Sequence, residues 1–111
     1  VDREVRILLA KPGGGEALDW LDTTKHPKHF VWEMSIANAR EMVRTFIEKG
    51  AVRVTVVDPS EAFGKIAAVQ FAIELPSDPA SRGRCIEYYR SITEDDEVVD
   101  VGQKYLLYTS D

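Results

Sequence analysis

Cysteine is almost absent from this chain of 111 residues, which contains only Cys85. A single cysteine cannot form an internal disulfide, so the sequence predicts a reducing, cytoplasmic setting and a small buried thiol at this position. Long apolar runs are also absent, and the longest falls far short of the ~20 residues that a membrane-spanning helix needs. The chain opens Val-Asp-Arg-Glu, without the basic and then apolar leader of a secretory signal.

Basic residues are outnumbered, with 14 Lys and Arg against 19 Asp and Glu, for a net charge of −5. This balance argues against general nucleic-acid binding, which needs a basic patch, and against an anionic membrane surface. Hydrophobic residues make up 44% of the chain. That share, at this length, predicts one domain spanning residues 1–111, with a modest core that needs no disulfide or metal.

Periodic patterns predict four strands and two helices. Residues 35–50 have apolar side chains at helical spacing, with Ser35 as a cap and Gly50 as a stop. Asp78 and Pro79 predict the start of a second helix that ends near Ile92. Alternating or β-branched runs predict strands over residues 3–10, 53–57, 67–75 and 98–109.

The order of these elements resembles the ferredoxin-like superfold, an α+β arrangement of the type βαββαβ. The resemblance implies a four-stranded antiparallel sheet in which the predicted strands take the order four, one, three, two, with both helices on one face. Residues 11–34 would form a long loop between the first strand and the first helix. In an alternative α+β sheet, residues 30–34 add a fifth strand.

This topology predicts an apolar sheet face opposite the helices. The face would contain Leu8, Ala10, Thr55, Val57, Ala68, Gln70 and Ala72. Two covers are possible: the 11–34 loop, with its aromatic residues Trp20, Phe30 and Trp32, or a second copy of the chain. We favour the second copy, because a loop that begins with three glycines is a poor permanent cover. The small Ala68 and Ala72 also leave room for a ligand pocket, although indole rings that fill the space are the simpler interpretation.

No catalytic signature accompanies these patterns. His26 and His29 are the only histidines, but Pro27 breaks their spacing and Lys28 would repel a cation, so we predict surface histidines and no metal site. The glycines after Lys11 lack a full phosphate-loop pattern. The acidic run at 94–97 lacks the spaced ligands of a calcium loop. We expect no cofactor.

The sequence therefore favours a non-catalytic interaction or regulatory module. We expect a homodimer that associates through the open sheet face, or a module that binds a small ligand or a protein partner. The candidate ligand or interface residues are Trp20, His26, His29, Phe30, Trp32, Ala68, Gln70 and Ala72. The alternative is a small cofactor-free enzyme with its pocket between the sheet and the 11–34 loop, where a histidine or a tyrosine would act as acid or base.

Overall fold

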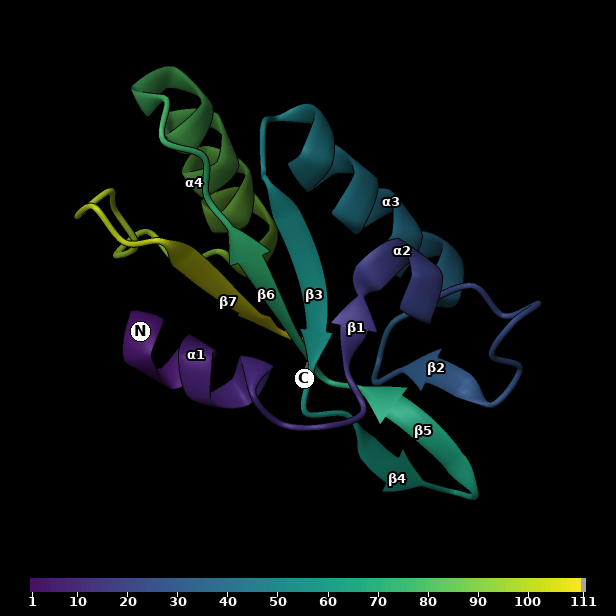
Figure 1. Ribbon diagram of the computed structural model, residues 1–111. Coiled ribbons are helices and arrows are strands. Elements are labelled where there is room, and N and C mark those ends of the chain that lie inside the picture. The colour runs from purple at the N-terminus through teal and green to yellow at the C-terminus, as the bar shows by residue number, and fades with distance from the viewer. Residues whose placement is uncertain (111) are drawn as a thin grey trace.

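A computed structural model of the chain describes residues 1–110, which form an α+β arrangement with two β-sheets (Figure 1). The helices are α1 (Asp2–Leu9), α2 (Ala17–Trp20), α3 (Ile36–Glu48) and α4 (Pro79–Thr93). The strands are β1 (Gly15–Glu16), β2 (His29–Val31), β3 (Arg53–Val57), β4 (Ser60–Ala62), β5 (Lys65–Ala68), β6 (Gln70–Glu74) and β7 (Tyr105–Thr109).

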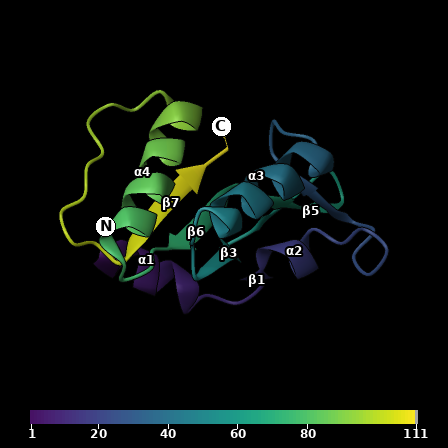
Figure 2. The ribbon, with the colours of Figure 1, turned by 90° about the horizontal axis from the view of Figure 1, so that it is seen from above.

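The main sheet has four antiparallel strands in the order β1-β3-β6-β7. Its register places Thr55 opposite Ala72, and Ala72 opposite Leu107. Both long helices, α3 and α4, cover the same face of this sheet (Figure 2). An α+β arrangement with a four-stranded antiparallel sheet is therefore confirmed, although its strand β1 was not among the predicted strands.

The two long helices begin at the caps that the sequence predicted. The Ser35 hydroxyl accepts a hydrogen bond from the Asn38 N–H at 3.0 Å, and the Asp78 carboxylate accepts one from the Ser81 N–H at 2.9 Å. Each cap satisfies an N–H group that has no partner inside its own helix. Local sequence thus decides where both helices start.

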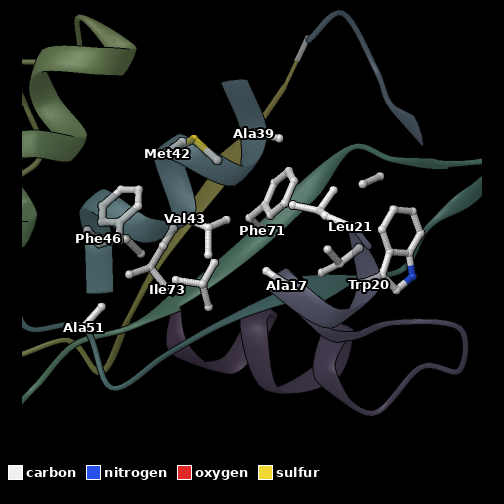
Figure 3. Close-up of a cluster of buried hydrophobic side chains, with 14 of the residues drawn as sticks. Ala17, Trp20, Leu21, Ala39, Met42, Val43, Phe46, Ala51, Phe71 and Ile73 are labelled. Atoms are coloured by element: carbon white, nitrogen blue, oxygen red, sulfur yellow. The ribbon is translucent and has the colours of Figure 1, made fainter. Parts of the chain in front are cut away.

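The main core lies between the sheet and these helices (Figure 3). Val43 and Phe46 of α3 meet Phe71 and Ile73 of β6, and all four side chains are fully buried. Trp20 of α2 extends this core toward the second sheet. Burying large apolar side chains is the main favourable term in folding, so this cluster holds the helices on the sheet.

The predicted strand over residues 3–10 was wrong, because this segment forms the helix α1. Its apolar residues fit both periods: Val5, Ile7 and Leu9 alternate, whereas Val5 and Leu8 have helical spacing. The segment forms a helix because Val5 and Leu8 then lie on the same face and both pack on the sheet. With no strand from this segment, β7 pairs directly with β6, and the ferredoxin-like strand order is not confirmed.

Helix α1 lies against the sheet face that we expected to be open (Figures 1 and 2). Val5 and Leu8 pack against Val57, Ala72 and Tyr105 in a second buried cluster. Ala72 is consequently buried within this one chain. At these positions the cover is α1, which is neither the 11–34 loop nor a second copy.

The second sheet has the strand order β2-β5-β4, with β2 parallel and β4 antiparallel to β5. The predicted strand over residues 67–75 divides at Val69, so that β5 belongs to this sheet and β6 to the main one. The alternative strand over residues 30–34 forms in part, as β2, but it joins the second sheet. The 11–34 segment is therefore structured through β1, α2 and β2.

The predicted last strand, over residues 98–109, is shorter than expected, and β7 begins at Tyr105. Arg82 of α4 holds the preceding loop: its guanidinium donates to the Asp100 carboxylate at 2.7 Å and to the Gln103 carbonyl at 2.7 Å. Both bonds involve the charged guanidinium and are therefore stronger than neutral ones, and they hold Asp100 and Gln103 in the loop before β7. No helix within residues 1–110 is long and apolar enough to cross a membrane.

Candidate functional site

Trp20 occupies the space between the main sheet and the 11–34 segment. Helix α2 presents it, after Glu16 caps that helix by accepting from the Asp19 N–H at 2.9 Å. The Trp20 side chain is only 4% exposed, and its indole N–H donates to the Gly13 carbonyl at 3.0 Å. A buried indole with its N–H satisfied is typical of packing, and this ring is buried in the main core together with Ala68, whereas Ala72 is covered by α1.

The two histidines form a stack on the same indole. The ring centroids of Trp20 and His29 lie 3.8 Å apart, and those of His29 and His26 lie 4.5 Å apart. His29 Nδ1 is 2.8 Å from the Trp20 carbonyl oxygen. Because a carbonyl oxygen only accepts, Nδ1 of His29 carries the hydrogen. Sequence reasoning grouped these three residues as candidates, and the structure brings them together.

Asp19 lies beside this stack but is already engaged. Its carboxylate accepts from the Lys25 ammonium at 2.9 Å and is 3.7 Å from Nε2 of His26. The hydrogen bond from Lys25 and its charge lower the pKa of Asp19, with a smaller contribution from His26. Within residues 1–110, no three His, Cys, Asp or Glu side chains are grouped so that they could hold a metal ion. The arrangement is suited to holding the loop in place.

Phe30, Trp32 and Phe63 form a separate cluster at the second sheet, here called the aromatic surface. The rings of Trp32 and Phe63 are parallel, 1° apart in orientation, with centroids separated by 6.2 Å. The ring centroid of Phe30 lies 6.4 Å from that of Trp32. The Phe63 side chain is 86% exposed, which is unusual for a large apolar group held in a fixed position.

The hairpin between β4 and β5 places Phe63 at its tip. Phe63 and Gly64 are the two loop residues between the paired Ala62 and Lys65, and both have positive φ, 57° and 72°. Two-residue hairpin loops of this kind match the twist of the strands, although a phenylalanine at positive φ is uncommon. Sequence reasoning did not include Phe63 among the candidates, and its position directly before a turn glycine was the available signal.

Charges of both signs border the aromatic surface. Lys28, Glu61 and Lys65 line a depression of about 370 Å³ together with Phe63. Glu61 and Lys65 come from the same hairpin, so the turn that exposes Phe63 also fixes these two charges next to it. The border of the aromatic surface therefore contains both positive and negative charges.

The remaining candidates, Ala68, Gln70 and Ala72, do not join either aromatic group as one site. Ala68 is fully buried in the main core, opposite Val31. Ala72 lies beneath α1. Gln70 is half-buried at the end of β6, where its register partners are Val57 and Thr109. The sequence placed all three on an open face because it foresaw neither α1, which covers Ala72, nor the division at Val69, which moves Ala68 into the second sheet.

Burial raises the pKa values of three titratable side chains, Cys85, Tyr89 and Tyr108. The Sγ of Cys85 lies 3.9 Å from the Phe46 carbonyl. The Tyr89 hydroxyl donates to the Leu107 carbonyl at 2.8 Å. A nucleophile needs the opposite shift for a thiol, because the thiolate is the reactive form.

The chain matches no protein-family model, no curated protein and no solved structure at a significant level of similarity.

Proposed function

We propose that the protein is a non-catalytic interaction module that forms a homodimer through its aromatic surface. The observation that carries this proposal is Phe63, which is 86% exposed at a hairpin tip and stacked on Trp32. Exposed aromatic side chains held in place are typical of association surfaces, because they bury a large area at a small cost in side-chain entropy.

The mixed charges at the border favour a second copy as the partner. A two-fold axis brings the same surface patch of both copies together, so each charge must find its opposite within that patch. Lys28 and Lys65 lie near Glu61, and a two-fold arrangement can set a lysine of one copy against the glutamate of the other. The exposed edge of β4, which contains Glu61, offers backbone groups to the same partner.

This location differs from the one expected from sequence. The open sheet face at Ala72 is covered by α1, so association there would require the helix to leave. The aromatic surface requires no such movement. It also retains Phe30 and Trp32, two of the residues that the sequence proposed for binding.

The alternative of a small cofactor-free enzyme has less support. Its pocket was expected between the main sheet and the 11–34 segment, but Ala68 is buried with the Trp20 indole in the main core and Ala72 is buried beneath α1. His26 and His29 stack on one another and on that indole, and neither lines the groove of about 610 Å³ beside β7.

Sedimentation velocity over a wide range of protein concentrations tests the proposal. We expect the wild-type chain to reach a dimer and Phe63→Ser to remain a monomer over the same range. Val101→Ser is the matched control, since Val101 is 77% exposed and lies at the opposite end of the fold, next to β7. A wild-type monomer at high micromolar concentration would overturn the proposal, and so would equal loss of the dimer in both variants.

A further inference from the structure

A groove of about 610 Å³ follows the outer side of β7, and it is separate from the aromatic surface. Its walls come from the start of α1, from Tyr89 of α4 and from the loop that precedes β7. Strand β7 is at the edge of the main sheet (Figure 1). The groove therefore gives access to a sheet edge rather than to the interior of the core.

The register of β7 decides which backbone groups face this groove. Lys104 accepts from the Leu75 N–H, and the Ser110 N–H donates to Val69, so the even-numbered residues bond to β6. Backbone groups of an antiparallel strand alternate in direction, which turns those of Tyr105 and Leu107 outward into the groove. Two contacts agree with this alternation: the Tyr105 N–H donates to Asp2, and the Leu107 carbonyl accepts from Tyr89.

The Tyr105 carbonyl and the Leu107 N–H also point outward, and neither has a hydrogen-bond partner within residues 1–110. An antiparallel neighbour would need both the N–H and the carbonyl of one β7 residue. In Tyr105 the N–H already bonds to Asp2, and in Leu107 the carbonyl already bonds to Tyr89. A parallel neighbour needs the carbonyl of one residue and the N–H of the residue two further on. The free pair fits this second pattern.

The charged side chains that line the groove are all acidic: Asp2, Glu4 and Asp95. Apolar side chains of Val98, Val101 and Leu107 lie between them. Asp2 and Glu4 belong to α1, whereas Asp95 follows α4, so the carboxylates stand on both sides of the strand edge. An occupant with basic side chains on both of its faces would complement these charges.

We propose that this groove binds a short extended peptide segment with basic and apolar residues, which adds to β7 as a parallel strand. One peptide N–H donates to the Tyr105 carbonyl, and the carbonyl of the same peptide residue accepts from the Leu107 N–H. Main-chain bonds of this kind supply affinity in strand addition, and side chains supply selectivity. Here the acidic walls select basic residues, and Val98 and Leu107 contact an apolar one.

Fluorescence anisotropy with three labelled peptides tests the proposal on the full chain. The probe is Val-Lys-Thr-Val-Lys, whose two lysines point to opposite faces of an extended chain, and the matched controls are Val-Glu-Thr-Val-Glu and Val-Lys-Pro-Val-Lys. We expect saturable binding of the probe only, because the first control reverses the charge and the proline of the second removes the central N–H. Equal binding of either control, or no saturable binding of the probe at about 1 mM, would overturn the proposal.

Variants of the protein separate the acidic walls from the rest of the surface. Glu4→Gln and Asp95→Asn should each weaken binding of the probe about two- to fivefold, the range expected for one exposed charge pair. Glu48→Gln is the control, because Glu48 is exposed on α3 and does not line the groove. An equal effect of all three variants would show a response to net charge and would contradict the proposed site.

Amide hydrogen exchange gives a second measurement that does not depend on charge. The probe should protect the Leu107 amide and leave the amides of β4 unchanged, and absence of protection at Leu107 would contradict strand addition. The groove is independent of the aromatic surface. We expect Phe63→Ser to bind the probe as wild type does, so failure of the dimer and failure of this groove give different results.

Discussion

At the residue scale, Gly50 shows how closely the two long helices approach each other. Gly50 follows α3 with a φ of 112°, a backbone conformation that residues other than glycine rarely adopt. A Cβ at this position would lie 2.8 Å from the Cβ of Ser81 in the first turn of α4. The glycine therefore serves two needs, since it ends one helix and leaves room for the start of the other.

Gly50→Ala should lower the free energy of unfolding by about 1–3 kcal/mol, the cost of holding a side chain in such a conformation. Urea denaturation measures the change. Gly83→Ala is the matched control: Gly83 is exposed within α4, and a Cβ there would meet nothing within 4 Å. Because alanine favours helix, we expect the control to gain up to about 1 kcal/mol. Equal effects at both sites would contradict this account.

Arg82 and Asp100 hold the loop before β7 in its position. Hydrogen bonding to the Arg82 guanidinium is the main cause that lowers the pKa of Asp100 from 3.8 to about 2, and the Gly102 N–H contributes as well. A carboxyl group with a lowered pKa in the folded state stabilises the fold when it is ionised. This contribution is complete above pH 3.8 and is lost as the pH falls through about 2.

Asp100→Asn should therefore reduce stability near neutral pH, and its difference from wild type should shrink between pH 4 and pH 2. Urea midpoints at several pH values measure this difference. Other carboxyl groups with lowered pKa values, such as Asp19 and Asp78, are present in both proteins and cancel. A flat profile for Asp100→Asn would refute the role of the ion pair.

At the element scale, α1 is the segment whose structure depends most on its surroundings. Asp2 and Glu4 stand in its first turn, where negative charge favours a helix. Eight residues are nevertheless too few for a stable isolated helix. Its stability comes from Val5 and Leu8 on the sheet, and from the Asp2 carboxylate, which accepts from the Lys104 N–H at 2.8 Å.

Leu8→Ala should lower the free energy of unfolding by about 2–3 kcal/mol, because it opens a cavity between α1 and the sheet. Ile7→Ala should change it by less than about 0.5 kcal/mol, because an exposed site leaves no cavity. The Leu8 side chain is 9% exposed and that of Ile7 is 55% exposed. Thermal and urea denaturation measure both. A strand over residues 3–10 would put Ile7 with Val5 on the inner face, so a larger effect at Ile7 would support that strand.

The helices and strands differ in how far the local sequence determines their boundaries and pairing. Ser35 and Asp78 predicted the starts of α3 and α4, because a cap acts on N–H groups within three residues. Strand β1 has only two residues, and it pairs with Val56 and Thr55, which are far away in the chain. The division of the predicted strand at Val69 likewise depends on two different partner sheets. No local pattern contains that information.

At the scale of the whole molecule, each face of the main sheet has its own cover. Helices α3 and α4 cover one face, and α1 covers part of the other (Figure 2). The apolar residues of β3 and β6 thus find partners within one chain. Among the large apolar side chains of residues 1–110, Phe63 at the hairpin tip is the most exposed, and this places the proposed self-association away from the main sheet.

If the chain is a homodimer, its thermal midpoint should rise with protein concentration, because unfolding then also separates the two copies. Scanning calorimetry at several concentrations measures this dependence. Phe63→Ser should remove it, and Val101→Ser should retain it. A wild-type midpoint that does not change with concentration would contradict the homodimer even if both variants fold normally.

Sequence alone determined the α+β class, the strand over residues 53–57, the presence of a strand within residues 67–75 but not its division at Val69, and both long helices with their caps. Each of these depends on interactions between near neighbours in the chain, or on a periodicity with only one good solution. Tertiary structure decided that residues 3–10 form a helix, because Val5 and Leu8 gain burial only when Val57 and Ala72 are in place. It also gathered Phe30 and Trp32 with Phe63, which lies more than thirty residues along the chain from either ring. Contacts across such distances exist only once the sheets have formed.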